Sequence, residues 1–132
     1  MYINFVYKVK YQPQPGYKFE EYDEKIGVSA YEEPLMLAMR YVLVKLRERR
    51  DSTQAIATLF KQSFESCLLN VQFQISEDTL YVTANYRSQA AVYRERDERM
   101  LSYLADYVMK EMGKMKVDIT CNVGNYHILS RK

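Results

Sequence analysis

Apolar and polar residues alternate along three stretches of this chain, which is the pattern of β-strands that bury one face. These stretches are residues 1–11, 69–75 and 80–86. Residues 76–79 read Ser-Glu-Asp-Thr, which is the composition of a tight turn. We therefore predict one separate strand near the start of the chain and a β-hairpin formed by the second and third stretches.

Three further segments are strand candidates because they are short and rich in apolar or β-branched residues. Residues 54–61 predict a buried strand. Residues 117–122 and 126–130 predict two closing strands, with Gly124 in the break between them.

Two longer segments have the periodicity of amphipathic helices. The first begins near residue 33, where Pro34 suits an initial turn, and it ends in a basic run at residues 47–50. The second spans residues 97–112 and is stopped by Gly113. Residues 17–31 show no clear period, and we predict a loop there, with a short helix or strand within it as the alternative. The apolar stripe of the first helix consists of Leu35, Met39, Val42, Leu43 and Leu46.

This order of elements predicts an α+β fold in which helices cover one face of a mixed sheet. The length of 132 residues predicts a single domain over residues 1–132. If the other sheet face is also apolar, it needs a cover, and two helices cannot supply one for both faces. We therefore expect a partner subunit on that face, either a second copy or a different protein.

The charge balance limits the classes of partner. A net charge of +2 does not indicate nucleic acid binding. Basic residues gather at residues 45–50 and 94–96, but acidic residues interrupt both runs, so we predict solvated helix ends. The alternative for each run is an anion site, because the arginine fork suits phosphate.

The chain opens without the pattern of a signal peptide, and no apolar run approaches the length of a membrane span. We expect a cytoplasmic protein that does not enter a membrane. The two cysteines, Cys67 and Cys121, are then expected to be reduced. No metal site is predicted.

Four residues carry the candidate chemistry. Cys67 stands directly before the hairpin, and Arg87 and Ser88 end its second strand. A guanidinium group holds phosphate, a hydroxyl adds a donor, and a nearby positive charge favours the reactive thiolate. His127 is the only histidine. Each residue also has an ordinary structural alternative: an inert cysteine, a salt-bridged arginine and a structural histidine.

The order of these motifs resembles the thymidylate synthase and deoxypyrimidine nucleotide hydroxymethylase family. In that family a cysteine opens a strand, a hairpin ends in Arg-Ser-x-Asp, and a Gly-Asp-x-His segment follows a helix. Here Cys67, Arg87-Ser88, the helix and Gly124-Asn125-Tyr126-His127 stand in that order, with the family's own spacing from cysteine to arginine. The resemblance covers residues 52–129.

The resemblance implies a role for each matching residue. Cys67 would be the nucleophile that adds to C6 of a pyrimidine nucleotide, which makes C5 nucleophilic. Arg87 and Ser88 would bind the phosphate, while Asn125 and His127 would contact the nucleotide. The one-carbon donor of the family is methylenetetrahydrofolate.

Several family positions carry other residues here. Thr53-Gln54 replace an arginine pair, Leu68 replaces the histidine after the cysteine, and Ala90 replaces the aspartate after Arg-Ser. Leu129 replaces a tyrosine, and we expect a truncated domain without the segment that closes over folate. The family has an asparagine that reads the base, and this chain has only Asp97 or Glu98 near that position.

These departures favour a degenerate relative that binds a deoxypyrimidine monophosphate or a protein, as a pseudoenzyme, a regulator or a subunit of a complex, without a cofactor. One alternative is a minimal transferase that uses Cys67 to add a methyl or hydroxymethyl group to dUMP or dCMP. The other is a plain α+β interaction module. Small divergent enzymes of this kind are typical of phage genomes, and we expect a phage origin.

Overall fold

The structure is a computed structural model that describes residues 1–19, 29–59 and 67–128, with residues 29–31 described by their backbone alone. The first strand and first helix are followed by three strands, a short 3₁₀ turn, a second helix and a last strand. Their bounds are β1 Tyr2–Val9, α1 Ser29–Glu48, β2 Ile56–Thr58, β3 Leu68–Ser76, β4 Thr79–Ala90, η1 Ala91–Tyr93, α2 Arg94–Met112 and β5 Lys116–His127.

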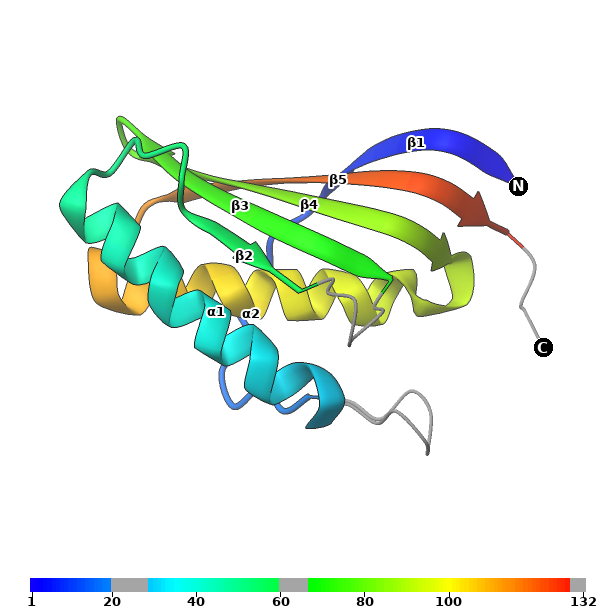
Figure 1. The fold of residues 1–132 in the computed structure, drawn as a ribbon, viewed down its shortest axis with the longest axis horizontal. Coiled ribbons are helices and arrows are strands. Elements are labelled where there is room, and N and C mark those ends of the chain that lie inside the picture. The colour runs from blue at the N-terminus through cyan, green and yellow to red at the C-terminus, as the bar shows by residue number, and fades with distance from the viewer. Residues whose placement is uncertain (20–28, 60–66, 129–132) are drawn as a thin grey trace.

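The strands form one five-stranded sheet in the order β1-β5-β4-β3-β2. The pair β4 and β5 is parallel, with α2 as the crossover between them, and the other pairs are antiparallel. Both helices lie on the same side of the sheet (Figure 1). The predicted α+β fold with a mixed sheet and helices on one face is confirmed.

The core lies between the sheet and the helices. The strand register aligns Phe73 with Val82, Val82 with Ile119, and Ile119 with Val9, so one apolar row crosses four strands. All four side chains are buried. The predicted helix stripe from Leu35 to Leu46 is also buried, and each such side chain stabilises the fold by about 1.5–3 kcal/mol.

The opposite face of the sheet is polar. Gln72, Thr83 and Thr120 stand side by side in the strand register. One row along, the side-chain amide of Asn122 donates to Asn85 at 3.1 Å, and the amide of Asn85 donates to Asn70 at 2.8 Å. The condition for the predicted cover, an apolar second face, is therefore not met. A partner on this face stays a prediction.

The prediction of two closing strands around Gly124 is wrong, because β5 runs unbroken from Lys116–His127. A Cβ atom at Gly124 would stand 2.9 Å from the carbonyl oxygen of Arg87 on β4. The glycine therefore permits a close approach of the two strands instead of ending one. Ser130, the expected end of the last strand, lies outside the described residues.

The remaining element bounds differ at their ends. Helix α1 begins at Ser29, so Pro34 lies inside it and not in its first turn. Helix α2 begins three residues before the expected start, and β2 covers only the middle of residues 54–61. Of the predicted loop over residues 17–31, residues 20–28 lie outside the described part. In that described part, neither helix is long and apolar enough to cross a membrane.

Candidate functional site

The structure brings Cys67 and Arg87 together at one end of the β3–β4 hairpin. The backbone N–H of Arg87 donates to the carbonyl oxygen of Cys67 at 2.7 Å, which extends the ladder past the Leu68–Tyr86 pair. The Nη2 atom of Arg87 lies 3.8 Å from the Sγ atom of Cys67. Both side chains are exposed to solvent. An exposed thiol thus stands in contact with a guanidinium group.

A β-bulge between Leu68 and Asn70 contributes to this arrangement. A bulge inserts one extra residue on one strand and re-aims the side chains beyond it. Leu68 and Tyr86 both point into the core, and the next residues toward the end of the hairpin, Cys67 before Leu68 and Arg87 after Tyr86, both reach solvent.

Ser88, Asn125 and His127 occupy neighbouring positions on β4 and β5. Ser88 pairs with Asn125, and Ala90 pairs with His127. Ser88 is buried, whereas Asn125 and His127 are half-buried. The structure therefore places Ser88 next to the Cys67 end of the hairpin, with Asn125 one strand away. Their roles toward a nucleotide stay predictions.

A cavity of about 140 Å³ opens beside Cys67, between the end of β4 and the start of α2. A cavity of this size holds about one six-membered ring, since benzene fits a cavity of roughly 150 Å³. Arg87, Asn125 and His127 are not part of its wall. The wall is formed by Cys67, Leu68, Tyr86, Ser88, Gln89, Ala90, Tyr93, Arg96, Asp97 and Met100.

A buried polar network forms one side of this cavity. The Tyr7 hydroxyl donates to Oε1 of Gln89 at 2.7 Å, and Nε2 of Gln89 donates to Oδ2 of Asp97 at 2.8 Å. The other carboxylate oxygen of Asp97 accepts from Nη2 of Arg96 at 3.4 Å. Because the first bond joins β1 to β4 and the second joins β4 to α2, the network holds the first turn of α2 against the sheet.

The solvated helix end predicted for residues 94–96 is wrong for Arg96 and holds only in part for Arg94, whose side chain is 34% exposed. The Arg96 side chain is only 13% exposed, and its guanidinium carbon lies 4.1 Å from the centre of the Tyr93 ring. Arg94 stacks on the Tyr7 ring at 3.7 Å and pairs with Glu98 at 3.1 Å. In contrast, the run at residues 45–50 ends in exposed side chains, as predicted.

The second cysteine has different surroundings from the first. Cys121 is completely buried in the core, and neither cysteine forms a disulfide. Burial raises the pKa of the Cys121 thiol to about 12. Burial, followed by the neighbouring Cys121, also raises the pKa of the Tyr7 hydroxyl above its usual range. Cys121 is therefore a protonated core residue at neutral pH.

Two residues of the site were missed at the level of sequence. Gln89 directly follows the Arg87-Ser88 pair, but strand alternation gives no reason to bury two successive polar residues. Tyr7 is one of thirteen tyrosines and lies 82 positions from Gln89. The sequence did point to Asp97, because this residue lies near the position of the asparagine that reads the base in the thymidylate synthase family.

The mixed five-stranded sheet with two helices on one face is a thymidylate synthase-like fold. The structure is similar to the crystal structure of thymidylate synthase from T4 phage, with a TM-score of 0.58 and 18% sequence identity. The match covers 71% of this chain and 35% of the phage enzyme, so this chain spans about a third of that protein. No family model and no curated protein match the sequence.

Proposed function

We propose that this protein binds a deoxypyrimidine nucleoside monophosphate at the Cys67–Arg87 end of the sheet and does not complete group transfer on it. The observation that carries this proposal is the 3.8 Å contact between the Arg87 guanidinium and the Cys67 thiol, at the edge of a ring-sized cavity. The similarity to a thymidylate synthase supports the same location.

The phosphate and the ring of the ligand would lie in two different environments. Its phosphate would pair with Arg87, because an exposed guanidinium offers two parallel donors to phosphate oxygens. Its ring would enter the cavity, where Tyr93 and Met100 supply apolar surface. Ser88 follows Arg87 and lines the cavity, where it would donate its hydroxyl to the ligand. The buried Gln89–Asp97 pair would keep the inner wall of the cavity rigid.

The same cavity argues against complete transfer of a one-carbon unit. A folate donor would have to stack beside the nucleotide ring, and about 140 Å³ holds only one ring. Pockets that enclose a drug-sized ligand have volumes of about 300–1,000 Å³. Methylenetetrahydrofolate would therefore need space outside this cavity, which supports a role that does not use this cofactor.

A binding role without turnover is the more economical interpretation of these features. The protein would act as a nucleotide-responsive regulator or as a subunit of a larger complex in the cytoplasm, and a phage genome would be its source. The polar sheet face is accessible to a partner, because Gln72, Thr83 and Thr120 are only half-buried there.

Titration calorimetry with dUMP and with dCMP tests the proposal. We expect saturable binding of at least one nucleotide to the intact chain. Arg87→Ala should weaken it by about 10- to 150-fold, since a hydrogen bond to a charged group contributes about 1.5–3 kcal/mol. Arg49→Ala is the matched control, because Arg49 is an exposed arginine that pairs with Asp51 away from the cavity. Absence of binding, or equal losses in both variants, would contradict the proposal.

A minimal transferase that uses Cys67 is the second candidate, and the exposed thiol beside Arg87 favours it. If the thiolate adds to C6 of the ring, C5 gains a carbanion that takes a proton from water. Reversal of the addition then exchanges the hydrogen at C5 with solvent. Mass spectrometry of dUMP or dCMP incubated with the protein in D₂O would detect this exchange. Exchange that disappears in Cys67→Ser would favour this second candidate over simple binding.

A further inference from the structure

The two edges of the sheet differ in how they are protected against pairing with a further strand. Natural proteins guard an edge strand with charged side chains or irregular backbone, because its outer N–H and C=O groups are a template for another chain. The β1 edge has both kinds of protection. Asn4 has a φ of 56° and drops out of the pairing with β5 between Ile3 and Phe5. Lys8 holds an exposed ammonium group 2.7 Å from Asp118.

The β2 edge has neither kind of protection. Residues 52–59 contain no charged residue and no proline. The backbones of Ala55 and Leu59 bond to β3, each at 2.9 Å. Alternate residues of an antiparallel strand face the same neighbour, so Ile56 and Thr58 turn their backbone groups away from β3. On that outer side, β2 pairs with no other strand among the described residues.

Most of these outward backbone groups are open to a partner in the described part of the chain. The N–H of Ile56 donates to the carbonyl oxygen of Gln54 at 2.8 Å. The carbonyl group of Ile56 and both the N–H and the C=O of Thr58 remain. An acceptor, a donor and a second acceptor in a row are the pattern that an extended backbone matches.

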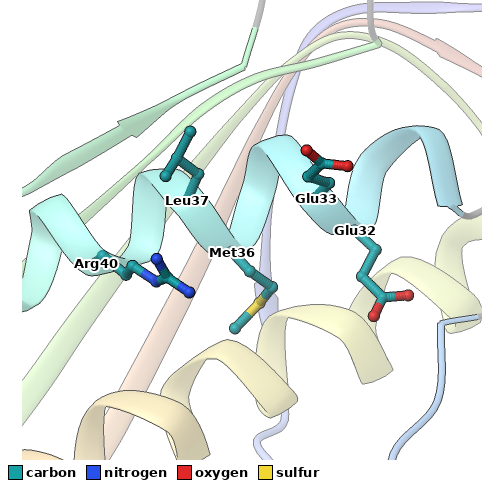
Figure 2. A pocket seen from close by; sticks show the side chains of 5 residues that line it. All are labelled: Glu32, Glu33, Met36, Leu37 and Arg40. Atoms are coloured by element: carbon teal, nitrogen blue, oxygen red, sulfur yellow. The ribbon is translucent and has the colours of Figure 1, made fainter.

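A groove of about 710 Å³ runs along this open edge, between β2 and helix α1. From the helix, Leu37 and Tyr41 line it, and these large apolar side chains are 64% and 48% exposed. Figure 2 shows Leu37 on the opposite side of the helix from Met36, which packs against the core. Ile56 and Thr58 line the other wall. Among the described residues no charged side chain lines the groove, so a matching segment is uncharged where it lies inside.

From the open edge and the groove beside it, we propose that β2 accepts an extended segment of another protein as an additional strand. Strand addition of this kind takes its affinity from backbone hydrogen bonds and its specificity from alternate side chains. The backbone of the segment bonds to Ile56 and Thr58. Because side chains alternate between the two faces of a strand, every second one meets Leu37 and Tyr41. The partner segment is therefore about five residues long, uncharged, and apolar at alternate positions.

This surface is separate from the proposed nucleotide site. The groove and the cavity beside Cys67 have no wall residue in common among those that the structure describes. A change in the groove should therefore leave the affinity for dUMP or dCMP unchanged. Failure of the proposed function would not affect this inference, and the reverse also holds.

The probe is a capped synthetic peptide in which valines alternate with threonines, between terminal lysines that keep it soluble. We expect titration calorimetry to show saturable binding with a dissociation constant below about 1 mM. The same peptide with a methyl group on each backbone nitrogen between the lysines keeps its side chains but loses its donors. It should bind at least about tenfold more weakly. Absence of binding at about 1 mM, or equal affinity of the two peptides, would overturn the inference.

Two variants test the two walls of the groove. Thr58→Pro removes the outward N–H of β2 and should weaken peptide binding at least about tenfold. Leu37→Lys, on the helix, should do the same without changing the sheet, which keeps the test decisive if the proline variant does not fold. Val6→Lys is the matched control, because Val6 is 60% exposed on β1 at the other edge. Equal losses in Leu37→Lys and Val6→Lys would also overturn the inference.

Two other occupants of the β2 edge would give different results. The amide of Thr58 should exchange its hydrogen rapidly in the free protein, and the peptide should slow that exchange. An amide that is already protected in dilute protein would show that another part of this chain covers the edge. Sedimentation that finds a dimer, which Thr58→Pro dissociates, would assign the edge to a second copy. Either result would overturn the inference.

Discussion

The two cysteines of this protein occupy opposite environments on the same sheet. Cys67 lies just before β3, exposed and in contact with the Arg87 guanidinium. Cys121 lies in the middle of β5, is buried, and has a thiol pKa raised to about 12 by burial. The two cysteines show that the position of a residue along a strand decides its exposure, and through exposure the reactivity of its thiol. The end of a hairpin exposes a side chain that the middle of a strand buries.

The difference extends to the polar neighbours of each cysteine. Beside Cys67, the Arg87 guanidinium group reaches solvent. Near Cys121, the Tyr7 hydroxyl is already committed to Gln89, which in turn donates to Asp97. One environment is suited to binding and the other to holding the fold together. The following predictions test this contrast, beginning with the largest expected effect.

Alkylation by iodoacetamide should separate the two thiols most strongly. With a pKa of about 12, only about one Cys121 thiol in ten thousand is ionised at pH 8. Burial also blocks access of the reagent, so Cys67 should react at least about a thousand times faster. Peptide mass spectrometry measures both rates, with unfolded protein as the control in which both cysteines react. Comparable alkylation rates for Cys67 and Cys121 in the folded protein would contradict the difference in their environments.

Removal of the amide at Gln89 should cost the most stability. Gln89→Leu leaves the Tyr7 hydroxyl and the Asp97 carboxylate without this buried partner, and we expect a loss of about 3 kcal/mol in the free energy of unfolding. Gln74→Leu is the same change on the solvent-facing side of β3 and should cost less than about 1 kcal/mol. Urea denaturation measures both. Similar losses in the free energy of unfolding for the two variants would show that the buried network does not stabilise the fold.

The stability of the protein should depend on pH in alkaline solution through Cys121. Its pKa is near 8.5 when unfolded and about 12 when folded, so unfolding releases a proton between these values. The contribution of Cys121 to the free energy of unfolding is complete below pH 8.5. Above that pH it falls by about 1.4 kcal/mol per pH unit, until it is lost near pH 12. Cys121→Val should therefore reduce the slope of unfolding free energy against pH between 9 and 11. An unchanged slope would contradict the raised pKa.

Gly124→Ala should have the smallest of these effects, because only one methyl group is added. The new Cβ would meet the Arg87 carbonyl oxygen at 2.9 Å and force β4 and β5 apart. We expect a loss of about 1–2 kcal/mol in stability, together with weaker nucleotide binding, because Arg87 moves. Asn122→Ala, two residues earlier on β5, is the control that should leave nucleotide affinity unchanged.

Local patterns were sufficient to predict much of this molecule. The alternation on both sides of residues 76–79 predicts the hairpin, but it does not show the bulge between Leu68 and Asn70, which shifts the register and brings Cys67 opposite Arg87. The helix stripe from Leu35 to Leu46 was also visible, because a period of 3.6 residues can be read without knowing what covers it.

Contacts between distant segments were not predictable in the same way. Nothing local to Tyr7 indicates that β1 pairs with β5, or that its hydroxyl reaches Gln89. Gly124 has the appearance of a strand break, and only the neighbouring backbone of Arg87 explains why the strand continues there. The arginines of residues 94–96 look solvated in the sequence because their aromatic covers, Tyr7 and Tyr93, are not recognisable as such.

The central claim is that Cys67 and Arg87 belong to one nucleotide site, and ligand protection of the thiol tests it most directly. The alkylation rate of Cys67 is measured with and without saturating dUMP or dCMP, in the intact chain and in Arg87→Ala. Our account predicts that the nucleotide slows alkylation at least about tenfold in the intact chain and has no effect in the variant at the same concentration. Equal rates with and without either nucleotide in the intact chain would contradict it.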